Sequence, residues 1–125
     1  PTYRALQSDS AQLLGQHAMG VVKGGGGEFE RHPGKAIELY GYNAADPFDL
    51  KMPTLEGAAA KRMKSDDEAP SIDAMMRLWD GSARDDFATA IVIATSGAAL
   101  FVAGAETDIA RADQMAEALW EDRQT

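Results

Sequence analysis

The longest uncharged stretch of the chain is FATAIVIATSGAALFVAG, which covers residues 87 to 104. An apolar run of this length is stable only when it is buried, either in a membrane or in the core of a protein. It is at the short limit for a membrane span and rich in Ala, Thr, Ser and Gly, in a chain whose mean hydropathy is −0.31. We therefore expect no membrane partner and a central helix, apolar on all sides and covered by its neighbours. Asp85 and Asp86 precede the stretch and favour the positive N-terminus of that helix.

Three amphipathic helices are predicted around this central one. Residues 2 to 16 have apolar positions at helical spacing, and Gly15 lies where such a helix would end. Ser71 is a favourable N-cap for a helix that Gly81 would end, and Thr107 is a favourable N-cap for the last helix. The apolar faces of these last two helices consist of Ile72, Met75, Met76 and Trp79, and of Ile109, Ala112, Ala116 and Leu119.

Three short strands are predicted between the first two helices. Residues 18 to 22 form an apolar run that is typical of a strand buried on both faces. Residues 35 to 42 and 48 to 53 alternate imperfectly, and the turn-like segment 43 to 47 between them predicts antiparallel pairing. Because strands and helices mix along 125 residues with room for one core, we expect a single α/β domain over residues 1 to 125.

Composition excludes several classes of function. A net charge of −8 and a pI near 4.6 disfavour nucleic acid as a partner, because non-specific binding of phosphates depends on Lys and Arg. The absence of cysteine excludes a disulfide framework, a zinc site built on Cys and a thiol nucleophile. No secretory leader is visible, and we take the cytoplasm as the default location.

The second unusual feature is VVKGGGGEFERHPGK at residues 21 to 35. Four glycines directly after a strand expose backbone N–H groups that can donate hydrogen bonds to the oxygens of a phosphate or diphosphate. Glu28 and Glu30 follow, and a magnesium ion takes carboxylate oxygens together with water and substrate phosphate. The alternative is a flexible turn with two solvated glutamates.

Two familiar nucleotide-binding patterns do not fit this segment. A Walker loop ending at Gly34 and Lys35 would need glycine at Phe29 and a hydroxyl at Ala36. The dinucleotide pattern G-x-G-x-x-G fails as well, because its last glycine would fall on Phe29 or Glu30. The segment therefore predicts a general anion-binding loop and not one of these folds.

The block LLGQHAMGVVKGGGGEFERHPGK resembles a segment of anthranilate phosphoribosyltransferase and its paralogues, the glycosyltransferase family 3 enzymes. In that family a helix ending in Leu-Gly leads to an Ala-Val-Val-His-Gly strand and an acidic DGLDE loop. The later SGAALFVAG resembles the family's buried NAGAALYVAG helix. The likeness is greatest to a paralogous branch that carries VVKGGGGEFERHPGK nearly intact.

The resemblance implies a three-layer α/β/α fold on a mixed sheet, the C-terminal part of the nucleoside phosphorylase and phosphoribosyltransferase catalytic domain. It also implies that the chain is a fragment of a longer protein and lacks an N-terminal helical domain. Substrates of the family bind in a cleft between the two domains, so this chain would form half of a cleft. We expect a homo-oligomer.

The resemblance also assigns roles to residues of the glycine-rich segment. Lys23 stands where the family has the His of its His-Gly pair, and Gly24 matches that Gly. Gly27 and Glu30 match the Gly and the last acid of DGLDE, whereas Phe29 replaces its aspartate. The expected substrate-binding set is Lys23, Gly24, Gly25, Gly26, Gly27, Arg31, His32 and Lys35, with Glu28 and Glu30 as magnesium ligands and no residue assigned as catalytic.

The function implied is glycosyltransferase-like, with a pentosyl or phosphoribosyl group transferred from a diphosphorylated pentose donor in the presence of Mg to an acceptor that remains unassigned. The isolated chain is expected to be inactive, since half of the cleft is absent. The alternative is a non-catalytic paralogue that binds anions or nucleic acid. Phe29 motivates this alternative, whose contacts would be Arg31, His32 and Lys35.

Overall fold

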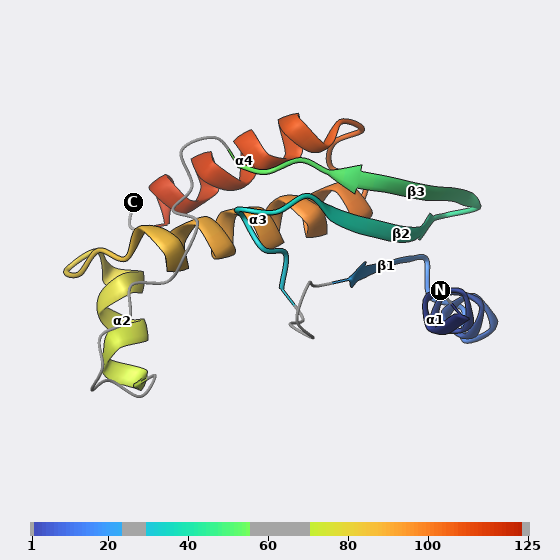
Figure 1. The fold of residues 1–125 in the computed structure, drawn as a ribbon, viewed down its shortest axis with the longest axis horizontal. Coiled ribbons are helices and arrows are strands. Elements are labelled where there is room, and N and C mark those ends of the chain that lie inside the picture. The colour runs from blue at the N-terminus through green and yellow to red at the C-terminus, as the bar shows by residue number, and fades with distance from the viewer. Residues whose placement is uncertain (1, 24–29, 56–70, 124–125) are drawn as a thin grey trace.

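The computed structural model describes residues 2–23, 30–55 and 71–123. Its elements are α1 (Thr2–Leu13), β1 (Ala18–Lys23), β2 (Ile37–Asn43), β3 (Asp46–Met52), α2 (Ile72–Asp80), α3 (Asp86–Val102) and α4 (Ile109–Asp122). Figure 1 shows the strands toward one end of an elongated molecule with α1 beyond them, while α3 and α4 run side by side and α2 projects from the other end. The predicted mixture of helix and sheet is confirmed.

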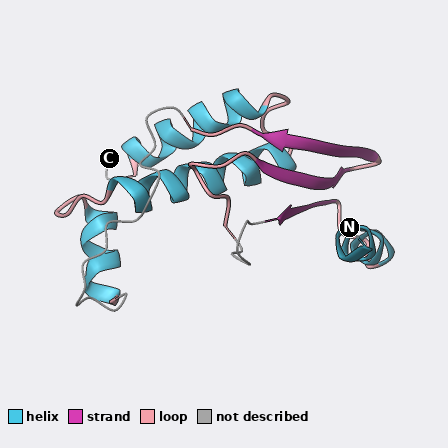
Figure 2. Ribbon diagram, viewed as in Figure 1, coloured by secondary structure: helices cyan, strands magenta, loops and turns pink. Residues whose placement is uncertain are grey.

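The three strands form one antiparallel sheet in the order β1-β2-β3 (Figure 2). The pairing predicted for β2 and β3 is confirmed, and Asn43 faces Asp46 across a tight turn in which Ala44 has a φ of 53°. Every pair in the described sheet is antiparallel, whereas the resemblance implied a mixed sheet. The described residues do not confirm the three-layer arrangement, which stays a prediction.

The strand predicted from residues 18 to 22 forms as β1, but it is not buried on both faces. None of its residues is buried, because β1 lies at the edge of the described sheet and pairs with β2 alone. The end of α3 covers one face at Gly20, where an added Cβ would lie 2.6 Å from Cγ2 of Val102. The apolar run thus marks a strand covered on one side.

The core lies between the sheet and the C-terminal half of α3. Its buried centre consists of Ile37, Leu39, Met52 and Ala98. Half-buried apolar side chains from both layers surround it, among them Phe48 and Phe101, whose rings meet edge to face at 5.3 Å. This packing fixes α3 on the sheet and so determines where its N-terminal half extends beyond it.

Helix α3 packs closely against α4 through small residues. Ala94 of α3 and Ala112 and Ala116 of α4 are buried, and Gly97 of α3 lies directly against Asp113 of α4. The expectation that α3 is covered on all sides is wrong, since Val92 and Ala99 are exposed on the described surface. Within the described ranges, no helix is long and apolar enough to cross a membrane.

Most of the predicted helix ends are confirmed. Ser71 caps α2 by accepting a hydrogen bond from the N–H of Ala74, and Gly81 ends the helix with a φ of 83°. Asp85, which was expected only to favour the positive N-terminus of the central helix, caps α3 in the same way. The prediction of Thr107 as the cap of α4 is wrong, because the extended residue before the helix is Asp108, whose carboxylate accepts the N–H groups of the first helical turn.

Candidate functional site

The residues expected to bind substrate fall on both sides of a break in the described structure. Gly24 to Gly27 and Glu28 lie outside the described residues. Lys23 ends β1 with an exposed side chain and pairs through its backbone with Glu38 of β2. Because β2 begins two residues after the exposed Lys35, Lys23 and Lys35 belong to the same end of the sheet.

Arg31 is not on the surface, where an anion contact would require it. Its side chain is fully buried and forms a bidentate ion pair with Asp113, with Nη1 2.6 Å from Oδ1 and Nη2 3.0 Å from Oδ2. Nη1 also donates to the carbonyl of Ala94 at 3.3 Å, and Nη2 to that of Pro53 at 2.8 Å. The Nε atom has no hydrogen-bond partner among the described residues. The guanidinium is thus engaged inside the protein.

The backbone around Arg31 is held as firmly as its side chain. The N–H of Arg31 donates to Oγ1 of Thr95 at 3.2 Å, which ties the segment to the middle of α3. Two residues later, the carbonyl of the buried Pro33 accepts the N–H of Leu55 at 2.9 Å. The segment that leads from the glycine run into β2 is therefore fixed between α3 and the residues after β3.

His32 is half-buried and points toward the start of α3. Its Nδ1 accepts the N–H of Gly34 at 3.0 Å, and its ring meets the edge of Phe87 at a centroid distance of 5.6 Å. The accepting Nδ1 carries no proton in this arrangement, so only Nε2 remains to donate to a ligand. Glu30, next to Arg31 on the other side, is half-buried.

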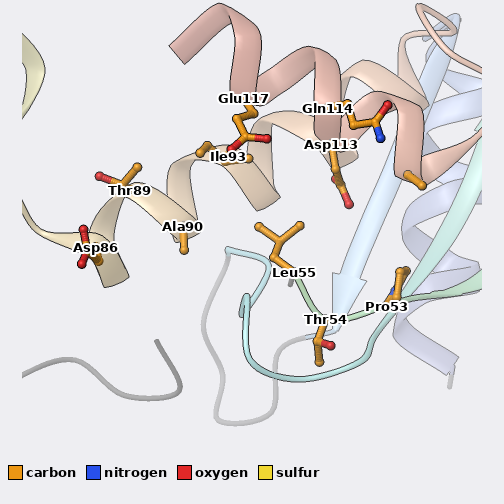
Figure 3. A pocket seen from close by; sticks show the side chains of 11 residues that line it. Pro53, Thr54, Leu55, Asp86, Thr89, Ala90, Ile93, Asp113, Gln114 and Glu117 are labelled. Atoms are coloured by element: carbon orange, nitrogen blue, oxygen red, sulfur yellow. The ribbon is translucent and has the colours of Figure 1, made fainter. Parts of the chain in front are cut away.

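A cavity of about 530 Å³ lies beside the Arg31–Asp113 pair. Figure 3 shows that side chains of α3, α4 and residues 53 to 55 converge on it. Its polar lining consists of Thr54, Asp86, Thr89, Asp113, Gln114 and Glu117. Three of these six are acids, and Asp113 is already paired with Arg31, so the cavity presents negative charge.

Sequence reasoning missed the α4 contribution to this cavity. Asp113 follows directly after Ala112 in the buried stripe of α4, and an acid at the edge of an apolar stripe is the only signal that pointed to it. The motif SGAALFVAG also has a structural explanation, since a Cβ at Gly97 would collide with Oδ1 of Asp113. Gly97 therefore makes room for the acid that holds Arg31.

The chain matches no model of a known protein family, no curated protein and no solved structure in the comparisons. The family likeness noted from residues 13 to 35 and 96 to 104 therefore stays a prediction. What the site can do has to be argued from the residues themselves.

Proposed function

We propose that the chain supplies one wall of a glycosyltransferase site, at which a pentosyl or phosphoribosyl group leaves a diphosphorylated pentose donor. The observation that carries the proposal is the anchoring of the glycine-rich segment. Strand pairing holds its entry at Lys23, and the buried Arg31 holds its exit. Binding residues are often on loops that a rigid scaffold positions, and a solvated turn would not need a buried ion pair.

The proposed reaction is displacement at the anomeric carbon of the donor. The acceptor's nucleophilic atom bonds to that carbon, while the bond from the carbon to the pyrophosphate oxygen breaks and its electron pair leaves with the pyrophosphate. Groups that neutralise the charge developing on the leaving group lower the barrier of such a step. In the proposed site, the backbone N–H groups of Gly24 to Gly27 and the ammonium group of Lys23 have this role.

Magnesium fits this residue set as a companion of the donor. The described residues contain no cluster of three or more His, Asp or Glu side chains that would hold a metal alone. Mg²⁺ bound with a phosphorylated substrate usually takes only one or two carboxylates, and Glu30, together with Glu28 from the sequence, would supply them. When bound, the ion would neutralise charge on the diphosphate.

The cavity beside Arg31 is unsuited to the diphosphate itself. Asp86 and Glu117 would repel phosphate oxygens, and the guanidinium of Arg31, which lies beside the cavity in the described structure, is already committed to Asp113. We therefore assign the donor to the glycine-rich residues that follow Lys23 and not to this cavity. A separate helical domain, facing the three-layer α/β/α domain to which this chain would belong, would close the cleft from the opposite side.

Isothermal titration of the chain with phosphoribosyl pyrophosphate and magnesium tests the donor assignment. We expect binding heat that Lys23→Ala weakens at least several-fold, because an exposed ammonium at a phosphate site contributes directly to affinity. Lys51→Ala is the matched control, since Lys51 is also exposed on a strand of the same sheet. No heat at millimolar ligand would overturn the assignment, and turnover is expected only from a protein in which the cleft is complete.

Nucleic-acid binding by a non-catalytic paralogue stays a prediction, but the structure leaves fewer residues available for it than we expected from the sequence. Arg31 is buried against Asp113, so a polymer would meet only His32 and Lys35 of the expected set. The net charge of −8 opposes it as well. A gel-shift affinity that did not weaken from low to high salt would count against this alternative.

A further inference from the structure

Helix α2 presents its apolar face to solvent. Ile72, Met75 and Met76 are 78%, 67% and 57% exposed, and none of the residues of α2 is buried. These side chains recur at helical spacing on one side of the helix, which is the pattern of a helix that packs against something. A helix of nine residues gains little stability by itself, so contacts made by this face matter to it.

The position of α2 is nevertheless fixed at its C-terminal end. Arg123, after α4, donates from Nη2 to the carbonyl of Leu78 at 3.0 Å and from Nε to that of Trp79 at 2.8 Å. Its guanidinium also lies 3.7 Å from the ring centroid of Trp120, and the rings of Trp79 and Trp120 meet edge to face at 6.0 Å. These contacts fix the orientation of α2 relative to the end of α4, and Figure 1 shows the helix projecting from the rest of the molecule.

An apolar groove of about 460 Å³ begins where α2 ends. It runs between α3 and α4 on the side away from the cavity beside Arg31, and Val92, Leu100, Leu119 and Trp120 are among the residues that line it. Trp79 of α2 lines it as well, so the exposed face of α2 and the groove form one continuous apolar surface.

The sequence of α3 indicates that another surface packs over this groove. The helix has no charge after Asp86 and is apolar on every side, yet its buried residues all lie on the faces toward the sheet and α4. A helix that is apolar all round is normally buried all round. The face formed by Val92, Ser96, Ala99 and Ala103 is the part that the described structure leaves open.

We propose that a second copy of this chain covers the surface, with α2 of each copy lying in the α3–α4 groove of the other about a two-fold axis. The same chain carries a projecting apolar helix and an open apolar groove, which is the complementarity that a two-fold contact requires. The proposal does not depend on the proposed transfer reaction.

The area available is sufficient for a stable dimer. Large side chains have roughly 150–250 Å² each, so the exposed parts of Ile72, Met75, Met76 and Trp79 present on the order of 500 Å². Two such faces alone present on the order of 1,000 Å², and the groove surfaces that receive them add to this, so the contact falls near the lower end of the about 1,200–2,000 Å² that specific interfaces usually bury. A face of this size is also at the upper end for the largest apolar patch of a monomer.

Charge does not oppose the contact. Among the residues that the structure describes, Arg123 is the only charged one that lines the groove, and its guanidinium already donates to the carbonyls of Leu78, Trp79 and Trp120. Docking of α2 would therefore not strand an unpaired charge at the centre of the interface.

Sedimentation and light scattering over about 1 to 100 µM test the proposal. We expect a mass near twice the 13.3 kDa of the chain at the upper concentrations. Met75→Glu on α2 and Leu119→Glu in the groove should each weaken the dimer at least ten-fold. Leu13→Glu is the matched control, because Leu13 of α1 is also apolar and 89% exposed but lies on a different element. A monomer at all concentrations, or a dimer lost only in Leu13→Glu, would overturn the proposal.

A cross-linking experiment identifies the surfaces even if a glutamate variant fails to fold. Because the chain has no cysteine, single cysteines can be introduced by Met76→Cys in one copy and Ala99→Cys in another. A short bismaleimide should join the mixed copies. Equal yields when Leu13→Cys replaces Met76→Cys would show random collision and contradict the proposed pairing.

Discussion

Arg31 and Asp113 are 82 positions apart in the chain and form a bidentate ion pair inside the protein, with N–O distances of 2.6 and 3.0 Å. Arg31 precedes β2, Asp113 is on α4, and the carbonyls of Ala94 and Pro53 accept from the same guanidinium. One side chain thus joins α3, α4 and the segments before β2 and after β3.

Removal of one partner of this pair should be strongly destabilising. Asp113→Ala leaves a buried guanidinium without its counter-charge, and we expect the free energy of unfolding to fall by about 3–5 kcal/mol. Urea denaturation measures it. Arg4→Ala is the control, because the Arg4–Glu38 pair is partly exposed at 3.1 Å and should contribute at most about 1 kcal/mol. Similar small losses in both variants would contradict the structural role of Arg31.

Gly97→Ala should destabilise the protein, although alanine is the better helix former. Propensity alone would stabilise a helix by about 0.5–1 kcal/mol. The new Cβ would collide with Oδ1 of Asp113, which Arg31 holds in place, and overpacking of this kind costs about 1–3 kcal/mol. Ser96→Ala, the neighbouring substitution on the groove side, should change stability little. A higher thermal midpoint for Gly97→Ala would show that Asp113 can move aside.

The N-cap of α4 can be distinguished from the residue before it. Asp108→Ala removes the acceptor for the N–H groups of Ala110 and Arg111, and should lower the free energy of unfolding by about 0.5–2 kcal/mol. Thr107→Ala at an exposed position should change it by less than about 0.5 kcal/mol. Parallel urea titrations compare the two, and the reverse order would return the cap to Thr107.

Asp80, at the end of α2, should titrate below the usual aspartate range. Hydrogen bonds from the side chain and backbone of Ser82 lower the pKa of its carboxyl group, and Arg77 and Arg123 add smaller contributions. A pKa lowered by folding stabilises the folded state above the ordinary aspartate pKa, and this contribution is lost as the pH falls through the lowered value. Carbon-detected NMR titration should show the low pKa and its partial return in Ser82→Ala. An unchanged pKa in that variant would assign the shift to the backbone N–H of residue 82 and the arginines, and not to the Ser82 hydroxyl.

Local signals in the sequence determined most of the secondary structure. The cap Ser71, the ends at Gly15 and Gly81, and the antiparallel pairing of β2 with β3 all depend on residues a few positions apart. Such features are readable because capping and turn formation are local hydrogen-bonding and backbone effects. The cap of α4 was missed by one residue, since Thr107 and Asp108 are both good caps and only the backbone conformation chooses between them.

The tertiary structure alone decided which of these residues are buried. No pattern near Arg31 in the sequence predicts its pairing with Asp113. Without that partner, a basic residue close to a glycine run is interpreted as a surface contact for anions. The exposure of β1 and of the outer face of α3 could not be predicted either. An apolar run indicates that a segment can be buried, but it does not show which other segment packs against it. Burial depends on contacts between distant segments, which a pattern within one segment does not contain.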